Sequence, residues 1–183
     1  VGKILEYYGE GLKHLSAMDR HVIANMGAEL GATTTVFPSD DETKRFLRSQ
    51  GREDDWVELV ADEGCVYDLH EEIVLSELVP LIAKPTSPGN VVPVSEVAGK
   101  SIGQVVIGSS ANPGLRDFWM AGAIVRDKTV SSEVSFDINP TSRQIIQNMI
   151  ENRAFANLIK AGERFHQSGC MGCIGMGQAP ASD

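Results

Sequence analysis

The feature that most constrains the fold is a repeated order of apolar strand, small polar loop and helix in the second half of the chain. Residues 102–108 form a short apolar run that ends in glycine, residues 109–114 are turn formers, and residues 115–125 carry a helical pattern. Residues 134–138 alternate as a second strand, and residues 144–152 follow as a second helix. Because this order favours parallel pairing, we predict an α/β fold with a parallel or mixed sheet.

Polar and thiol side chains follow the strands of this predicted sheet. Ser110 comes soon after the first strand, Arg143 after the second, and Cys170 and Cys173 after a further helix predicted over residues 155–161. In open α/β sheets, ligands bind outside the carboxyl ends of the strands, where such loops meet. We therefore expect these four side chains to lie at one edge of the sheet and to form a site.

Two of the three cysteines, Cys170 and Cys173, are separated by two residues within the glycine-rich stretch 169–175. Thiolates at this spacing can reach one metal ion or cluster, and the glycines allow a tight turn around them. The pair alone is typical of half a zinc site, of a redox couple and of part of an iron–sulfur cluster. Cys65 is isolated in the sequence, which favours a buried structural thiol.

The first half of the chain contains a predicted helix over residues 16–30. Ser16 with Asp19 three positions later is a helix-capping pattern. Asn25 and Glu29 are four residues apart, so their side chains share one face of this helix. The small residues between and after them favour close packing around the carboxylate, as at a functional site. The alternative is that both side chains are merely solvated.

Composition limits the classes of function. A formal net charge of −9 argues against binding along a nucleic acid, since phosphate contacts need a basic surface. The same charge is compatible with a small anionic substrate held by a few local arginines. No apolar run reaches membrane-spanning length, and the N-terminal residues lack the apolar core of a signal peptide. Three cysteines cannot form a full set of disulfides, so a cytoplasmic location is expected.

Several motifs occur along the chain in a fixed order: NMGAELGATT at 25–34, VFP at 36–38, GCVYD at 64–68, LSEL at 75–78, IGS at 107–109 and GCMGCIG at 169–175. Together they resemble the aconitase family of iron–sulfur hydro-lyases. The resemblance covers nearly the whole chain, so it is far more specific than any single motif.

The resemblance implies a four-iron, four-sulfur (4Fe-4S) cluster that three cysteine thiolates hold, with one iron left free to bind substrate. Cys170 and Cys173 match two of the three ligands. The family's other ligand lies in an Ile-Gly-Ser-Cys-Thr-Asn motif, and the matching position here is Ser110. A hydroxyl is harder and much less acidic than a thiol. The cluster is therefore expected to be serine-ligated, completed by a cysteine from outside the chain, or absent.

The resemblance also assigns catalytic roles and a domain organisation. Glu29 matches an active-site glutamate of the family, and Asn25 a neighbouring active-site asparagine. Residues 1–84 match the C-terminal part of the family's second domain, residues 85–94 a linker, and residues 95–183 the N-terminal part of the third domain with the two-cysteine loop. Both domains would be three-layer structures, with helices on both faces of parallel or mixed sheets.

The function that the resemblance implies is the reversible dehydration and rehydration of citrate to isocitrate through cis-aconitate, a step of the tricarboxylic acid cycle. The chain would be a central piece of such an enzyme and inactive alone. Its partners would be a small tricarboxylate substrate and the remaining domains of the same enzyme. The alternative is a non-catalytic binding module that is derived from this fold and lacks a complete cluster.

Overall fold

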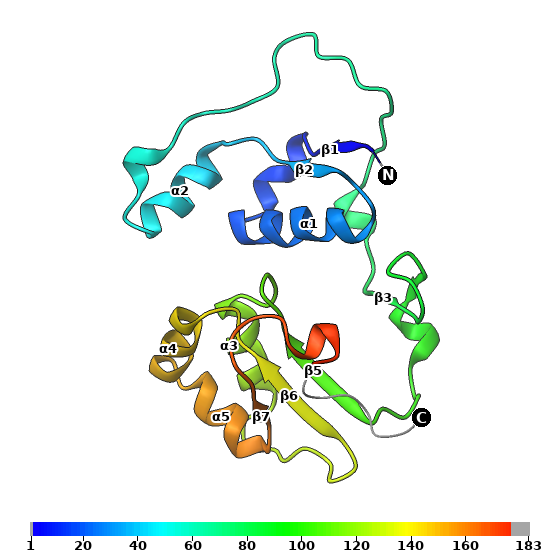
Figure 1. The fold of residues 1–183 in the computed structure, drawn as a ribbon, viewed down its shortest axis with the longest axis vertical. Coiled ribbons are helices and arrows are strands. Elements are labelled where there is room, and N and C mark those ends of the chain that lie inside the picture. Colours follow the sequence, from blue (N-terminus) through cyan, green and yellow to red (C-terminus); the bar gives the residue numbers. More distant parts are fainter. Residues whose placement is uncertain (1, 177–183) are drawn as a thin grey trace. The chain divides into compact units, whose positions relative to one another are not determined.

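The computed structural model describes residues 2–176 and divides the chain into two compact units. Unit 1 is Val1–Gly99 and unit 2 is Lys100–Asp183. Both units combine helices with small sheets, which confirms the mixed α/β class (Figure 1). The residues expected to form a linker, 85–94, lie within unit 1. None of the helices found between residues 2 and 176 is long and apolar enough to cross a membrane.

Unit 2 is built on a parallel sheet in which β5 (Gln104–Gly108), β6 (Ser135–Asn139) and β7 (Arg164–Phe165) lie in this order. β5 and β6 pair over their full lengths, and β7 pairs with the middle of β6. The parallel sheet and its two longer strands are as predicted. β7 has only two residues, so its sequence carries no alternating pattern by which a strand is recognised.

Three helices cover one face of this sheet: α3 (Leu115–Ile124), α4 (Arg143–Glu151) and α5 (Ala154–Ala161) (Figure 1). α3 and α5 pack closely because Gly122 has no side chain: an added Cβ would come within 3.0 Å of the Ala154 Cα. Apolar residues at helical spacing and at every second position of β6 meet in one core. Its buried members are Phe118, Phe136, Ile138, Met149, Ala154 and Leu158.

The other face of the sheet is polar, because Ser135 and Asp137 alternate with the core residues along β6. The fully buried Asp137 carboxylate accepts hydrogen bonds from Gln104 and Ser135 and lies 3.0 Å from His166 Nε2. Burial alone would raise the pKa of Asp137. The hydrogen bonds from Gln104, His166 and Ser135 and the charge of Arg164 outweigh burial, so the pKa lies below its usual value.

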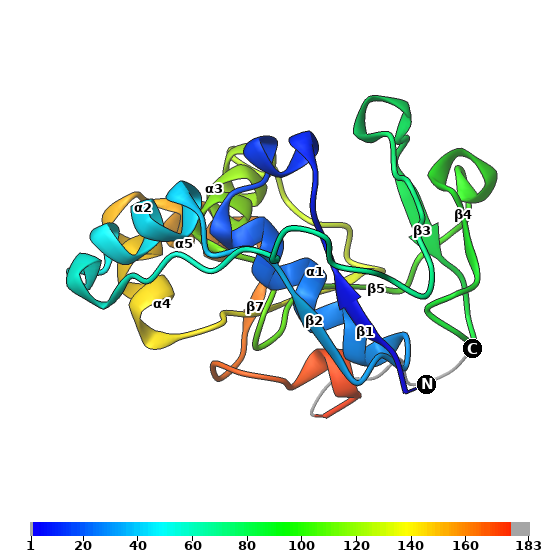
Figure 2. The same ribbon diagram turned by 90° about the horizontal axis from the view of Figure 1, so that it is seen from above.

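Unit 1 places helix α1 (Ala17–Glu29) against a parallel pair of strands, β1 (Ile4–Glu6) and β2 (Thr34–Val36) (Figure 2). The predicted capping pattern is present as a capping box. The Ser16 hydroxyl accepts from the Asp19 amide at 3.2 Å, and the Asp19 carboxylate accepts from the Ser16 amide at 2.9 Å. These contacts satisfy two backbone groups that the start of a helix leaves unpaired.

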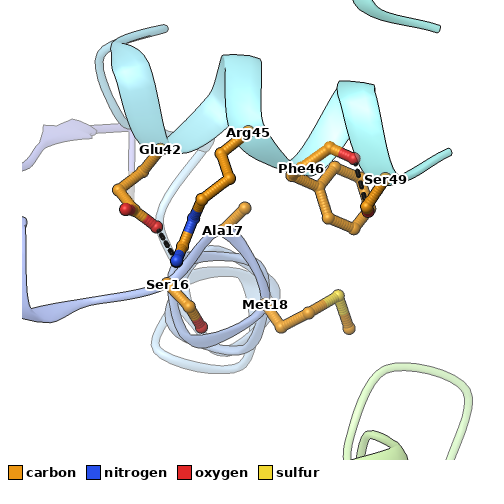
Figure 3. Close-up of a pocket in the computed structure, with 7 residues that line it drawn as sticks. All are labelled: Ser16, Ala17, Met18, Glu42, Arg45, Phe46 and Ser49. Atoms are coloured by element: carbon orange, nitrogen blue, oxygen red, sulfur yellow. Dashed lines mark hydrogen bonds and ion pairs between the residues drawn. The ribbon is translucent and has the colours of Figure 1, made fainter. Parts of the chain in front are cut away.

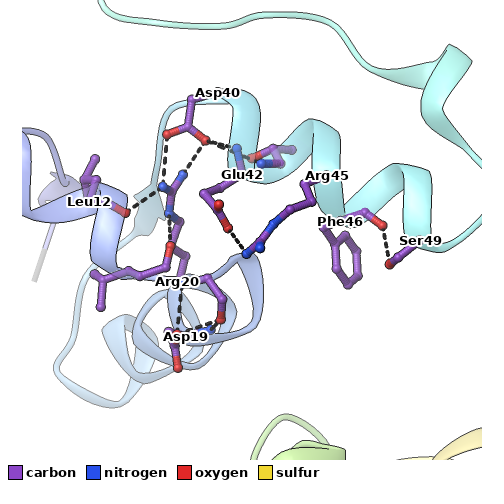
Figure 4. A network of polar contacts seen from close by, with 11 residues as sticks. Leu12, Asp19, Arg20, Asp40, Glu42, Arg45, Phe46 and Ser49 are labelled. Atoms are coloured by element: carbon purple, nitrogen blue, oxygen red, sulfur yellow. Dashed lines mark hydrogen bonds and ion pairs between the residues drawn. The ribbon is translucent and has the colours of Figure 1, made fainter.

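A buried arginine joins α1 to helix α2 (Asp41–Ser49), as Figure 4 shows. Arg20 is 4% exposed, and its guanidinium donates to both carboxylate oxygens of Asp40 at 2.8 and 3.0 Å. It also donates to the carbonyl oxygens of Leu12, Leu15 and Pro38. Asp40 in turn accepts from two amides in the first turn of α2 and caps that helix. One guanidinium therefore holds together the segments around α1.

The rest of unit 1 has little regular structure. β3 (Leu81–Ala83) and β4 (Val91–Pro93) form an antiparallel pair, and nearly every side chain of residues 57–99 is exposed. The sequence patterns predict an extended segment or strand over residues 66–75 and a short helix that begins at Glu53. No strand forms over residues 66–75, and the helix is limited to the 3-10 turn Glu53–Asp55. A residue pattern yields a strand or helix only where its apolar face meets another surface, and unit 1 offers no such surface here.

Candidate functional site

The loop after β5 holds Ser110 at the carboxyl end of the sheet of unit 2. Ser109 Oγ accepts hydrogen bonds from the two amides that follow Ser110 and donates to the Asn112 carbonyl oxygen at 2.8 Å. The Thr141 hydroxyl donates to the Pro113 carbonyl oxygen at 2.9 Å and ties this loop to the loop after β6. The loops that follow two neighbouring strands are thus fastened to each other.

The loop that carries both thiols, residues 167–175 and hereafter the thiol loop, follows β7 and lies against β5. The Gly172 amide donates to the Asn139 side chain at 3.2 Å. An added Cβ on Gly172 would come within 2.7 Å of Val106 Cγ1, so only glycine allows this approach. A single 3-10 turn, Gly172–Ile174, then carries the second thiol.

The structure brings Ser110 and the two thiols together. Cys170 Sγ donates to Ser110 Oγ over 3.1 Å, although the two residues are 60 positions apart. Burial raises the pKa of the Cys173 thiol, and its hydrogen bond with Cys170 raises this pKa further. Three donor atoms therefore form one cluster at the carboxyl edge of the sheet. Arg143, expected at the same edge, is the exposed first residue of α4.

The chemistry of these donors matches a metal centre in part. Within residues 2–176, no group of three or more histidine, cysteine, aspartate or glutamate side chains is placed to hold a metal ion. Two thiols are soft ligands that suit iron, and the Ser110 hydroxyl beside them is a harder oxygen donor. The site fits a centre held by two thiolates and one oxygen, and it does not fit one held by three thiolates.

Asn25 and Glu29 lie on α1 in unit 1, and both are exposed. The expected close packing occurs at Gly27 instead, where an added Cβ would collide with the Thr35 hydroxyl of β2. Because successive helical residues are about 100° apart, a residue two positions away points to the opposite side of the helix. The expectation that unit 1 encloses the Glu29 carboxylate is therefore wrong.

Cys65 is also exposed, which overturns its prediction as a buried structural thiol. It lies in the segment of unit 1 whose side chains are almost all exposed. A cysteine is buried only where apolar neighbours pack around it, and the apolar side chains of this segment, such as Val66 and Leu69, are themselves exposed. The sequence around Cys65 does not show that its neighbours would leave the thiol exposed.

Two hollows occur in unit 1, and neither is lined by Asn25 or Glu29. One, of about 310 Å³, lies between the first turn of α1 and one side of α2 (Figure 3). Met18 and Phe46 line it, together with the Arg45 side chain, which pairs with Glu42. The other, of about 590 Å³, lies beside β1 and has several acidic side chains in its lining. Both are open hollows rather than enclosed sites.

Sequence reasoning missed the residues that support the thiol loop. Asn139 ends β6, is fully buried, and accepts from the Gly172 amide. Asp137 and His166 form a second contact near the start of the loop. The alternation of polar and apolar residues along β6 is visible in the sequence, but it does not show what covers the polar face. Only the path of the thiol loop answers that question.

Comparison with known proteins identifies the family of the chain. The sequence model of the aconitase family (aconitate hydratase) matches residues 1–183. The 3-isopropylmalate dehydratase large subunit 2 of Archaeoglobus fulgidus is 34% identical over 99% of this chain and 44% of that protein. Large subunit 2 of the same enzyme from Rubrobacter xylanophilus is 38% identical over 94% of the chain and 40% of the relative. The chain thus spans about two fifths of the length of these relatives. A match that runs through both units and all residues of the thiol loop shows that the chain belongs to the aconitase family.

Proposed function

We propose that this chain forms part of a hydro-lyase and supplies the residues that bind its iron–sulfur cluster. The observation that carries the proposal is the contact between Cys170 Sγ and Ser110 Oγ at the carboxyl edge of a parallel sheet; the hydrogen bond between Cys173 and Cys170 brings the third donor to the same place. Membership of the aconitase family gives these donors their chemical context. The remaining sequence that the longer relatives have would complete the enzyme.

In this proposal Cys170 and Cys173 bind the cluster as thiolates, and Ser110 binds it through oxygen. The cluster, when bound, supplies a Lewis-acidic iron. Cys173 has a raised pKa without metal, because burial and Cys170 both favour its neutral thiol, so binding must displace a proton. The Ser110 hydroxyl already accepts a hydrogen bond from Cys170, and a ligand at that point would replace this contact.

Glu29 and Asn25 would act on the substrate rather than on the cluster. A carboxylate can accept the proton that a reacting hydroxyl or water gives up, and an amide can orient the same oxygen by a hydrogen bond. Their spacing of one helical turn places both side chains on the same exposed face of α1. That face is open to a ligand from outside the unit.

The reaction would be the reversible loss of water from a hydroxy acid with several carboxylates. A C–O bond breaks at the hydroxyl, a proton leaves the neighbouring carbon, and the electron pair of that C–H bond forms the alkene. We propose citrate and isocitrate, interconverted through cis-aconitate, as in the tricarboxylic acid cycle. The names of the relatives point instead to 3-isopropylmalate, so both substrates belong in the assay. We propose a cytoplasmic location, since the three cysteines of this chain suit a reducing compartment.

The second candidate function is a binding module of the same family without a complete cluster. The serine in the third ligand position favours it, because a hydroxyl ligates iron less readily than a thiolate. This module would bind a partner through the same fold and would perform no dehydration.

Anaerobic reconstitution of the chain with iron and sulfide separates these two functions. Bound iron, acid-labile sulfide and absorption at about 400 nm report a thiolate-ligated cluster. We expect cluster formation in the wild-type chain, more complete loading in Ser110→Cys, and less in Ser110→Ala. Cys65→Ser is the matched control, because Cys65 is an exposed thiol of the other unit. If neither the wild-type chain nor Ser110→Cys binds iron and sulfide, the proposed function is wrong.

The substrate is tested on the full-length enzyme. Hydration of cis-aconitate is compared there with hydration of the alkene that 3-isopropylmalate gives on dehydration. Activity on cis-aconitate alone supports the citrate reaction. Activity on the second alkene alone overturns it and leaves the hydro-lyase chemistry in place.

A further inference from the structure

The thiol loop rests on the polar face of the sheet of unit 2, and one buried side chain lies beneath it. Asn139 is the last residue of β6 and has an exposed fraction of 0%. A buried amide is costly unless its donors and acceptors are satisfied. The partners of Asn139 therefore show what this side chain does for the fold.

Both ends of the Asn139 amide contact the thiol loop. Its Nδ2 donates to the Gln167 carbonyl oxygen at 3.4 Å, and its Oδ1 accepts from the Gly172 amide at 3.2 Å. These two backbone groups lie on either side of Cys170 in the sequence. One side chain thus bridges the segment from which the first thiol extends, and it does so from the end of the central strand of the sheet.

The same residue also meets the strand that leads to Ser110. Gly108, at the end of β5, has a φ of +143°, and an added Cβ there would collide with the Asn139 backbone carbonyl. Ser110 follows two residues later. Asn139 therefore touches the start of the Ser110 loop through its backbone and the thiol loop through its side chain.

Two other contacts fasten the loop at nearby points. The Gly169 amide donates to the Pro140 carbonyl oxygen at 3.2 Å, one residue after Asn139. The His166 amide donates to the Ile138 carbonyl oxygen at 2.8 Å, one residue before it. The end of β6 is thus a continuous support for the loop, and Asn139 is the only one of these three positions that acts through a side chain.

We infer that Asn139 is a positioning residue that holds Cys170 opposite Ser110 before any metal binds. Its amide restricts the loop to the conformation in which the three donors converge. The effect on cluster binding rests on the proposed function. The effect on the distance between position 110 and Cys170 does not, because that geometry is a property of the metal-free chain.

A thiol cross-link measures this geometry directly. In the full chain with Ser110→Cys, Cys65→Ser and Cys173→Ser, the thiols that remain are at position 110 and Cys170. Their equilibrium with glutathione under anaerobic, metal-free conditions gives their effective concentration relative to each other. We expect Asn139→Leu to lower this effective concentration about tenfold, equivalent to roughly 1.4 kcal/mol, through the loss of two hydrogen bonds.

Asn152→Leu is the matched control. Asn152 Oδ1 accepts from the Ala154 amide at 2.9 Å, in the connection between α4 and α5 and away from the thiol loop. We expect this variant to lose stability but to keep the effective concentration within about twofold, since the loop contacts remain. A purely structural role of Asn139 would give the same result for both variants, and that result would overturn the inference.

Asn139→Asp guards against a variant that fails to fold. Aspartate keeps an acceptor for the Gly172 amide and loses the donor to Gln167, so we expect a decrease smaller than that of Asn139→Leu. An unchanged effective concentration in both folded variants would contradict the inference.

In the chain without the other substitutions, Asn139→Leu is expected to reduce iron loading. If neither the wild-type chain nor Ser110→Cys binds a cluster, the proposed function fails while the cross-link result for Asn139 still stands.

Discussion

The two units are stabilised in different ways, although both combine helices with parallel strands. Unit 2 has a core of six buried apolar residues drawn from its three helices and from β6. In the described part of unit 1, the buried residues are Leu12, Arg20 and Gly27. Apolar burial therefore organises unit 2, whereas one guanidinium and its hydrogen bonds organise unit 1. The candidate cluster site lies in the unit with the core.

This difference has a direct consequence for the two halves of the predicted site. The thiol loop and Ser110 are held against a packed sheet, so their geometry is a property of unit 2 itself. Asn25 and Glu29 lie on an exposed helix face, where their side chains are open to solvent. A rigid support and an open face suit different tasks: the first can preorganise metal ligands, and the second can meet a substrate.

The largest expected effect comes from opening the core of unit 2. Phe118 on α3 has an exposed fraction of 0%. Phe118→Ala should lower the free energy of unfolding of unit 2 by about 4 kcal/mol, because it removes apolar contacts and leaves a cavity. Urea unfolding followed by circular dichroism measures this change. Trp119→Ala on the same helix is the control: Trp119 is 54% exposed, and an equally large loss there would contradict the distinction between core and surface.

A smaller effect is expected from the polar centre of unit 1. Arg20→Leu removes the bonds to Asp40 and to three carbonyl oxygens, and should destabilise the segments around α1 by about 2 kcal/mol. Amide hydrogen exchange in α1 and α2 reports this loss while leaving α3 as an internal reference. Arg45→Leu removes an exposed ion pair with Glu42. It should change the free energy of opening that hydrogen exchange measures by less than about 0.5 kcal/mol. Equal effects of the two variants would mean that Arg20 does not organise unit 1.

The smallest expected effect concerns Glu163, which is 7% exposed and whose two carboxylate oxygens have no hydrogen-bond partner within residues 2–176. Burial raises its pKa from 4.5 to about 7, and the charge of Asp137 adds to the shift. The folded state therefore binds more protons than the unfolded state between these two pH values. This contribution to stability is complete below pH 4.5 and is lost as the pH rises to about 7.

Glu163→Gln should remove that loss. When the pH is raised from 5 to 8, the free energy of unfolding of the variant should increase relative to that of the wild-type chain by on the order of 1 to 2 kcal/mol. Urea unfolding at both pH values measures the difference. Glu151→Gln on the exposed side of α4 should show no such gain. Identical pH dependence in the wild-type chain and Glu163→Gln would show that Glu163 does not titrate in this range.

Much of unit 2 was predictable because local pattern and tertiary packing agree there. The apolar run 102–108 and the alternation at 134–138 became β5 and β6, and the helix signals became α3 and α4. In unit 1 the capping residues Ser16 and Asp19 were equally informative, since a capping box depends only on neighbours in the sequence. No strand forms at residues 66–75, because a strand needs a neighbouring strand to pair with, and the local sequence cannot show whether one is present.

The candidate site likewise has some features that the sequence predicts and others that only the tertiary structure decides. The spacing of Cys170 and Cys173 and the place of Ser110 after a strand are features of the sequence, and so is the resemblance that gives them a role. Parallel pairing then follows from the order of the elements. The contact between Cys170 and Ser110, the exposure of Glu29 and the amide of Asn139 beneath the thiol loop depend on the tertiary structure alone. They join residues far apart in the chain, and packing rather than any local preference decides which of those residues meet.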